Sequence, residues 1–197
     1  MTATPRHQQL YSSHFETKVV LRRQALLDLP DPLRVLDAYH GQGEVWTEVA
    51  RRLDRPVEVV GIDKAPGEDS PAVLHGDNRK VLRAIDLDRY SLIDLDAYGM
   101  PTEQLRIVAD RAPHVPVMAT VIQHTIGPLP RTIMRDLGIP AMPDKRTGVY
   151  VPIRWDIWWW WWVAQLGYTH RSGVRFAEGM TKWYGLITRP APPRPAD

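Results

Sequence analysis

The sequence predicts a parallel, doubly wound α/β sheet that closes with an antiparallel hairpin, and three observations indicate this fold. Between residues 33 and 122, short apolar runs alternate with segments whose apolar residues recur three or four positions apart. A glycine-bearing turn joins the first apolar run to the first such segment, as expected where a strand leads directly into a helix. Beyond residue 125 the alternation stops, and two further strand-like runs follow near the end of the chain.

The alternating part is expected to contain strands separated by helices. The strands are short runs rich in Val, Leu and Ile: 33–38, 57–62, 72–75, 91–95 and 115–122. The helices between them carry an apolar stripe: 45–53, 78–85 and 102–111. Strands separated in this way pair in parallel, because the helical crossover returns the chain to the same end of the sheet.

The two ends of the chain are less regular. Residues 11–27 fit a helix with Ser12 or Ser13 as its N-cap, and we expect it to lie across the sheet edge or the binding pocket. This helix belongs to an N-terminal helical segment, 1–30. Residues 190–197 are proline-rich and cannot form a helix or a central strand, so we expect a flexible tail there.

The part after the fifth strand departs from the alternating pattern. Residues 126–154 carry several prolines around a short helix expected at 131–137, and we interpret them as an insertion, or lid, over one face of the sheet. A helix capped by Asp156 and running through Gln165 follows. Two strand-like runs complete a single domain, 1–189, as an antiparallel pair: 173–177 and 183–188.

Length and composition favour one globular domain and exclude several classes of protein. The 197 residues are 44% apolar and 24% charged. The sequence contains no cysteine, which excludes disulfides, thiolate metal sites and cysteine nucleophiles and favours a reducing cytoplasm. The seven histidines lack metal-ligand spacing, so no metal is expected. Residues 1–9 are polar where a signal peptide would be apolar, and the most apolar run, 157–164, is too short to cross a membrane.

Charge is distributed unevenly along the chain. Residues 1–124 hold 15 Lys and Arg against 18 Asp and Glu, whereas residues 125–197 hold 10 against 5. The basic C-terminal third predicts a phosphate-rich partner such as a nucleic acid, although ordinary surface charge would give the same count. Arginine outnumbers lysine 20 to 5, which suits bidentate phosphate contacts but is equally explained by coding bias.

The turn after the first strand, residues 37–43, reads DAYHGQG. Its glycines let the backbone approach a ligand and turn sharply into the helix. Asp63 ends the second strand about 20 residues later, where an acid binds ribose hydroxyls in dinucleotide-binding sheets. A nicotinamide fingerprint is disfavoured because Trp46 stands where its third glycine belongs, and no P-loop motif occurs.

This pattern resembles the first motif of class I S-adenosylmethionine-dependent methyltransferases. The resemblance implies a Rossmann-like, mostly parallel seven-stranded sheet with helices on both faces, and S-adenosylmethionine as the cofactor. It also implies a set of cofactor-binding residues: Asp37, Tyr39, Gly41, Gly43, Asp63, Asp77 and Asn78. Asp77 would accept the adenine amino group, and a plain helix N-cap is the alternative interpretation. The aromatic Tyr39, where many members have glycine, resembles the nucleic-acid amino methyltransferases of this class.

Residues 90–101, at the end of the fourth strand, read YSLIDLDAYGMP. The segment resembles DLDPYGSP, the catalytic motif of tRNA guanine-N2 methyltransferases, with Ala97 in place of the motif's first proline and Met100 in place of its serine. By this resemblance the catalytic residues are Asp96, Ala97 and Tyr98. The Asp96 side chain and the Ala97 carbonyl would accept hydrogen bonds from an exocyclic amine, while Tyr98 stacks on the base.

The chemistry of an exocyclic amine explains why acceptors are needed. Its nitrogen is a weak nucleophile because the lone pair is delocalised into the ring. Acceptors at its protons favour a tetrahedral nitrogen, and alignment with the methyl group supplies most of the remaining acceleration. Asp96 therefore need not be a strong base. Asp94, two residues earlier, is expected to have a structural role only, as a hydrogen-bond partner of neighbouring backbone or of a loop.

Other residues are weaker candidates. Four are candidate substrate contacts: Gly99, His124, Arg131 and Arg146. The tryptophan run, 158–162, points all round its helix, so some rings belong in the core and others under the insertion or at an interface with a second copy or a partner subunit. Stacking on bases is a further use for these rings.

Together these features favour a methyltransferase that uses S-adenosylmethionine to N-methylate an exocyclic amine of a nucleobase in RNA, of the tRNA guanine-N2 type. Two other classes remain open. One is a methyltransferase of DNA, of a small metabolite or of a protein, with the insertion as a lid. The other is a non-catalytic binding module on the same fold.

Overall fold

The computed structural model describes residues 14–64, 72–124, 131–136, 138, 155–176 and 180–189. Its strands are β1 Leu33–Asp37, β2 Val57–Asp63, β3 Val73–His75, β4 Leu92–Asp96, β5 Val117–His124, β6 Thr169–Phe176 and β7 Met180–Thr188. Its helices are α2 Phe15–Leu27, α3 Glu44–Arg52, α4 Asn78–Ala84, α5 Thr102–Arg111, α6 Arg131–Asp136 and α7 Trp155–Gln165. Expected and observed boundaries of the alternating part agree within two residues.

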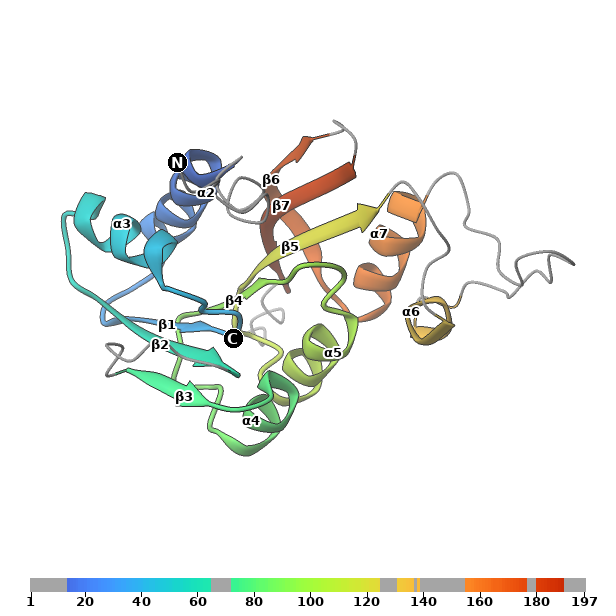
Figure 1. Ribbon diagram of the computed structural model, residues 1–197, viewed down its shortest axis with the longest axis horizontal. Helices are drawn as coiled ribbons and strands as arrows, with labels where there is room; N and C mark the ends of the chain where they lie inside the picture. Colours follow the sequence, from blue (N-terminus) through green and yellow to red (C-terminus); the bar gives the residue numbers. More distant parts are fainter. Residues whose placement is uncertain are drawn as a thin grey trace, which may run out of the picture.

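The strands form one seven-stranded sheet in the order β3-β2-β1-β4-β5-β7-β6 (Figure 1). Strands β1 to β5 pair in parallel, and β7 runs antiparallel to both β5 and β6. The predicted fold class, a doubly wound sheet with a terminal antiparallel hairpin, is therefore confirmed. The chain adds strands on one side of β1 and then on the other, so β1 and β4 meet at the point where ligands bind in sheets of this kind.

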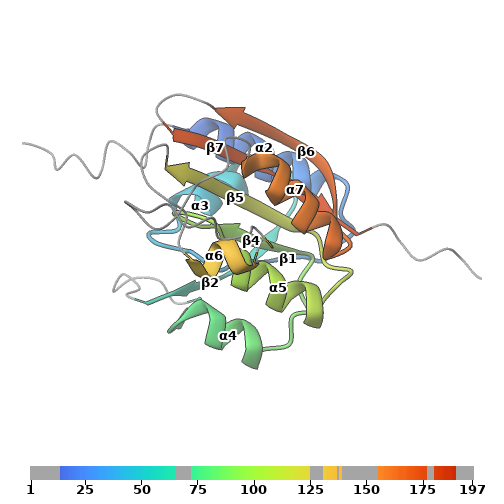
Figure 2. The same cartoon turned by 90° about the vertical axis from the view of Figure 1, so that its right-hand side faces the viewer.

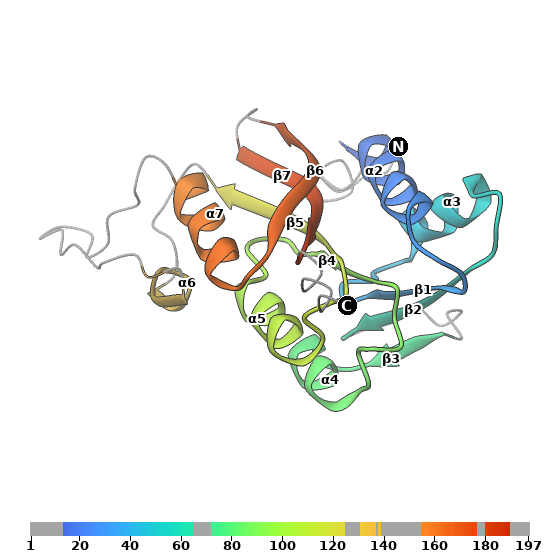
Figure 3. The same ribbon diagram turned by 180° about the vertical axis from the view of Figure 1, so that it is seen from behind.

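Helices cover both faces of the sheet. On one face, α2 and α3 lie side by side (Figure 3). Their buried Val19 and Trp46 belong to one apolar cluster with Val35 and Leu92 of the sheet. On the other face, α4, α5 and α7 bury a larger core, in which α4 and α5 are neighbours (Figure 2). Because successive strand residues point to opposite faces, each strand distributes its side chains between the two cores.

The N-terminal helix differs from its prediction in two respects. It begins at Phe15, and His14 occupies the N-cap position without a capping side-chain hydrogen bond, so the assignment of Ser12 or Ser13 as the cap is wrong. It also packs on α3 and β7, over one face of the sheet rather than across its edge. Its buried Val19 and Leu26 explain this position, because an apolar stripe must be covered.

The other differences lie in the C-terminal part. Helix α7 begins at Trp155, so Asp156 is a first-turn residue and not the predicted cap. Strand β6 begins at Thr169 rather than at residue 173. It is the edge strand and its residues 169–175 are exposed, so it lacks the apolar alternation that marks inner strands. The 190–197 tail and most of the 126–154 insertion lie outside the described residues.

The tryptophan run divides between core and surface as predicted. Trp159 and Trp162 are 1% and 5% exposed, whereas Trp161 is 48% exposed. Trp160 packs edge-on against Trp183 of β7, with ring centroids 4.6 Å apart. Trp161 lies beside Gly138, so it contacts the insertion. No helix in the described ranges is long and apolar enough to span a membrane.

This division predicts that substituting Trp159 and substituting Trp161 lower the free energy of unfolding by different amounts. Trp159→Ala removes a large core side chain and should lower the free energy of unfolding by about 3–5 kcal/mol, measured by urea denaturation. Trp161→Ala is the matched control on the same helix and should cost far less, because half of its ring is already in water. Equal losses in the two variants would contradict the assigned core.

Candidate functional site

The glycine turn after β1 is held to the end of β2 by a carboxylate. Gly41 and Gly43 have φ angles of +54° and +69°, a region that favours glycine. The Gly41 N–H donates to Asp63 Oδ2 at 2.8 Å. The turn and the acid that sequence reasoning associated with a nucleotide therefore meet at the carboxyl edge of the sheet.

His40 fills the space behind this turn. A methyl group at Gly43 or at Gly61 would overlap the His40 ring, so glycine is required at both positions. His40 Nδ1 lies 3.2 Å from Asp37 Oδ2. This hydrogen bond raises the pKa of His40, against the opposing effect of burial.

Asp37 supports the turn from behind and does not line the cleft. It is 4% exposed, and besides contacting His40 it accepts a hydrogen bond from the Tyr39 backbone N–H at 3.2 Å. Of the predicted cofactor-binding residues, Asp37 is therefore placed to shape the loop rather than to touch a ligand.

A cleft of about 900 Å³ opens beside the turn. It is lined by four of the predicted cofactor-binding residues: Tyr39, Asp63, Asp77 and Asn78. Burial raises the pKa of Tyr39 to about 12, so this ring is neutral at physiological pH. The cleft continues along α5 to Arg106 and reaches Asp136 of α6.

Asp77 and Asn78 also have structural roles. Asp77 caps α4 by accepting the Arg79 backbone N–H at 3.0 Å, as the alternative interpretation predicted, and its carboxylate also pairs with the Arg79 guanidinium. Asn78 donates to the Ala38 carbonyl and accepts from Gln104, each at 3.0 Å. Asn78 therefore fixes the turn after β1 relative to α4 and α5.

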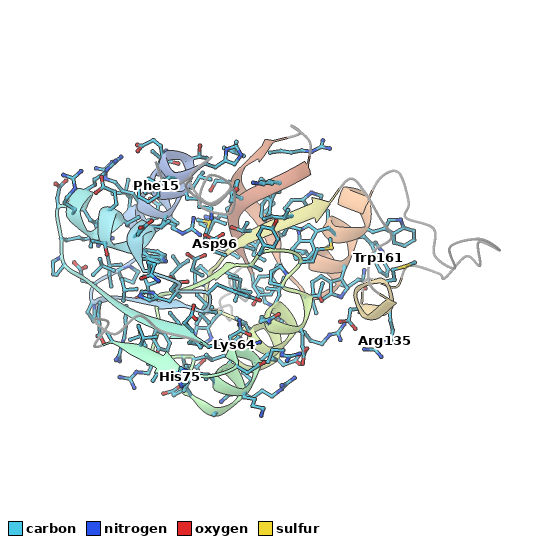
Figure 4. The ribbon with its side chains drawn as sticks, in the orientation of Figure 1. Phe15, Lys64, His75, Asp96, Arg135 and Trp161 are labelled. Atoms are coloured by element: carbon cyan, nitrogen blue, oxygen red, sulfur yellow. The ribbon has the colours of Figure 1, made fainter. Side chains whose placement is uncertain are left out.

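The proposed catalytic aspartate faces away from this cleft. Along β4, Leu95 points into the core beneath α5, whereas Asp94 and Asp96 point toward α2. Lys18 of α2 contacts Asp96 Oδ2 at 2.7 Å, and Arg22 approaches the same oxygen at 3.2 Å. Figure 4 shows Asp96 near the centre of the molecule, between α2 and β5.

These two cations determine the charge of Asp96. Burial opposes its ionisation, but the charges of Arg22 and Lys18 outweigh burial and lower the pKa of Asp96. Its carboxylate is therefore ionised at neutral pH. It can accept a hydrogen bond but is a weak base.

Asp94 sits deeper and binds side chains rather than the backbone or loop expected of it. Arg22 donates to both of its oxygens, at 2.6 and 3.0 Å, and the Trp46 indole N–H donates to Oδ2 at 2.8 Å. Arg22 and Asp94 are both about 1% exposed. Burial raises the pKa of Asp94, while Asp94 and Asp96 raise that of Arg22 in spite of its burial.

The residues after Asp96 form a tight turn at the surface. The Ala97 N–H donates to the Leu95 carbonyl at 2.9 Å, and Ala97 is buried. Tyr98 is 56% exposed, so a face of its ring is accessible. Gly99 has a φ of +144°, and its carbonyl accepts the Ile122 N–H at 2.8 Å, which ties the turn to β5.

Of the remaining substrate candidates, two can be located by their backbone and one cannot be located. The backbone of His124 ends β5, and that of Arg131 begins α6 at the far end of the cleft. Arg146 lies outside the described residues. In the described ranges, no group of three or more His, Asp or Glu side chains is arranged to hold a metal ion.

Sequence reasoning missed the cations around Asp96. Lys18 and Arg22 come from the N-terminal helix, which was expected across the sheet edge or the binding pocket but from which no site residue was named, and Lys182 comes from the hairpin. One signal was available: Arg22 falls on the same stripe as Val19 and Leu26, three residues after one and four before the other. A charge within an apolar stripe indicates a buried partner.

Comparison with known structures identifies the architecture. Magnesium protoporphyrin IX methyltransferase (ChlM) from Synechocystis PCC 6803, solved with bound SAM, matches with a TM-score of 0.57 over 96% of this chain and 86% of that chain. The chain has the class I methyltransferase fold. At 13% sequence identity this match establishes the fold alone.

A second match shares this methyltransferase fold. Trm1 from Pyrococcus horikoshii, in complex with S-adenosyl-L-methionine, gives a TM-score of 0.55 at 16% identity over 89% of this chain. The chain spans only 55% of the Trm1 chain. No protein-family model and no curated protein sequence matches the chain.

The Arg22–Asp94 pair should be the costliest polar interaction to break. Arg22→Met leaves Asp94 buried without its cation and should lower the free energy of unfolding by about 3–5 kcal/mol in urea denaturation. The loss should shrink at lower pH, because protonation removes the unpaired charge. Arg51→Met, which breaks an exposed pair with Glu48, is the control and should change stability much less. A loss no greater than that of the control would refute the role given to Arg22.

Proposed function

We propose that the protein is an S-adenosylmethionine-dependent methyltransferase that N-methylates an exocyclic amine of a nucleobase in RNA, of the tRNA guanine-N2 type. One observation carries the proposal. On a methyltransferase fold, the segment from Asp96 to Gly99 begins at the last residue of β4, immediately beside the strand that leads into the glycine turn. The acceptor-binding motif and the nucleotide-binding turn thus occupy neighbouring strand ends, where such sheets bind ligands.

The cleft fits the cofactor. Asp63 lies at the end of β2 as a ribose-hydroxyl ligand would, and Asn78 and Tyr39 line the same space. Gly41 leaves open space where a side chain would stand, so the backbone can approach a ligand closely. When bound, S-adenosylmethionine supplies a methyl group on a sulfonium sulfur, and its C–S bond breaks as the new N–C bond forms.

Asp96 and the turn after it would orient the acceptor. Lys18 and Arg22 both approach Asp96 at its Oδ2 atom, so Oδ1 is the oxygen that we assign to the amine. The Ala97 carbonyl would accept the second amine proton. Tyr98, with an accessible ring, would stack on the base. The low pKa of Asp96 suits hydrogen-bond acceptance, and the proton lost after transfer would leave to solvent.

The choice of RNA rests on the catalytic motif and on charge. The basic C-terminal third would supply phosphate contacts, and the exposed Trp161 would contact a second copy or a partner subunit that helps to hold the RNA. Figure 4 shows Trp161 and Arg135 on the side of the molecule formed by α6 and α7. The absence of cysteine is in keeping with activity in the cytoplasm.

A small acceptor is the second candidate, and the size of the cleft favours it. The cleft extends past the cofactor-binding residues to Arg106 of α5 and Asp136 of α6. Arg106 Nη1 lies 3.4 Å from Asp136 Oδ1, and this ion pair joins the two helices. An acceptor held there would lie against Arg135 and Asp136 of α6. Such an enzyme would methylate a metabolite and would show no steep dependence on salt.

Asp63 tests the cofactor assignment. Asp63→Ala should weaken S-adenosylmethionine binding about tenfold or more in calorimetry, because charge-assisted hydrogen bonds to the ribose are lost. The exposed Asp54→Ala is the control and should bind normally. If the unaltered protein gives no binding heat, or if Asp63→Ala binds as tightly as the control, the cofactor site is wrong.

Asp96 tests the catalytic assignment. In transfer of labelled methyl groups to total tRNA, rRNA, DNA and protein, Asp96→Ala should reduce transfer by about 100-fold or more while S-adenosylmethionine binding persists. Asp88→Ala, an exposed acid outside the site, should retain activity. The labelled nucleoside should be an N-methylated guanine. Full activity of Asp96→Ala would refute the role, and label in another acceptor class would replace RNA with that class.

A further inference from the structure

Lys182 is a buried charge that the proposed reaction does not use. It is 8% exposed and pairs with Ile122 across the β5–β7 ladder. Its neighbour Trp183 packs into the core on the far face, whereas Tyr184 packs with α2. Because side chains alternate along a strand, Lys182 points to the same face as Tyr184.

The strand registers place Lys182 next to Asp96. Asp96 pairs with Thr120, and Thr120 pairs with Tyr184. Lys182 precedes Tyr184 by two residues in β7, and because β7 is antiparallel to β5 this places it nearer the carboxyl edge of the parallel strands. Its ammonium interacts electrostatically with both Lys18 and Asp96. Two lysines, one from α2 and one from β7, therefore flank the proposed acceptor of the amine.

The two carboxylates on this face of β4 already have cationic partners. Arg22 is paired with Asp94, and Lys18 is paired with Asp96. Within the described part of the chain, no hydrogen bond or ion pair engages the Lys182 ammonium. Burial lowers the pKa of Lys182, and the charge of Lys18 lowers it further. Holding this cation in a partly desolvated position beside the Lys18 ammonium costs free energy, which a bound anion would recover.

We propose that Lys18 and Lys182 form a binding site for a phosphate group of the methyl acceptor, beside Asp96. The inference rests on the proposed function and deepens it: the amine at Asp96 and the phosphate at the two lysines belong to the same nucleotide or to adjacent ones. Two ammonium groups match the charge of a phosphate better than that of a neutral base or sugar.

Lys18 can serve both partners at once. Its ammonium carries three N–H donors, of which the contact with Asp96 Oδ2 uses one. A phosphate oxygen can take another without breaking the ion pair. Lys182 supplies the second contact from the opposite side, so a bound phosphate would separate the two ammonium groups and reduce their repulsion.

The small number of lysines makes a direct test practical. The sequence contains five, so protein labelled with ¹³C at lysine Cε gives five signals, assignable with Lys→Arg variants. Titration with inorganic phosphate should shift the Lys18 and Lys182 signals in a saturable manner, and the pKa of Lys182 should rise. The exposed Lys80, on α4 across the sheet, is the internal control. Shifts at Lys182 no larger than those at Lys80 would overturn the proposal.

The source of the phosphate is resolved by repeating the titration with two probes, guanosine 5′-monophosphate and a single-stranded oligoribonucleotide. Lys182 shifts with the mononucleotide alone support the subsite with a small acceptor, and shifts at lower concentrations of the oligonucleotide support it with an RNA strand. No shift at Lys182 with either probe would overturn the subsite.

Substitution of Lys182 separates this inference from the proposed function. Lys182→Met should raise the KM for RNA about tenfold with little change in kcat, and Lys182→Arg should restore most of the affinity. An unchanged KM would reject the subsite while leaving methyl transfer intact. Conversely, phosphate shifts at Lys18 and Lys182 in a protein that methylates no acceptor would retain the subsite and reject the proposed function.

Discussion

The buried guanidinium of Arg22 is the interaction on which the site depends. It crosses from α2 to β4, 72 residues later in the sequence, and holds both oxygens of Asp94 in a region closed to solvent. A buried ion pair of this kind gives less stability than apolar packing would, but it tolerates only one geometry. It therefore fixes the position of α2 relative to the sheet, and with it the position of Lys18 above Asp96.

The strand β4 divides the site into two halves. Leu95 joins the core on the α5 face, and Asp94 and Asp96 reach the α2 face. The cleft assigned to the cofactor opens among β1, β2, α4 and α5, whereas the polar cluster assigned to the acceptor lies under α2 and beside β7. The two reactants would meet only over the end of β4, at the turn from Asp96 to Gly99. This geometry keeps the charged acceptor contacts away from a cofactor that is itself cationic.

The sequence predicted the elements whose residues signal their own structure. Apolar runs, helical spacing and glycine turns are local, so β1 to β5 and α3 to α5 could be placed, as could Asp63 at a strand end. The ion pairs around Asp96 could not be predicted. A charge within an apolar stripe, such as Arg22, indicates burial, but no local pattern identifies the distant residue with which it pairs. The hydrogen bond from Trp46 to Asp94 could not be predicted for the same reason. The predicted edge strand, 173–177, began four residues later than β6 does. Its exposed residues carry no apolar alternation from which the earlier start could be predicted.

The packing of His40 against two glycines has a consequence for how this sequence can change over time. Gly43 and Gly61 lie on different elements, yet each leaves its side-chain space to the same imidazole. Neither glycine can acquire a side chain while His40 is present, and a smaller residue at position 40 would leave a cavity that Gly61 alone cannot fill. Positions 40 and 61 are therefore expected to vary together among relatives, with small residues at 40 accompanying larger ones at 61, whereas the positive φ of Gly43 favours glycine whatever stands at 40.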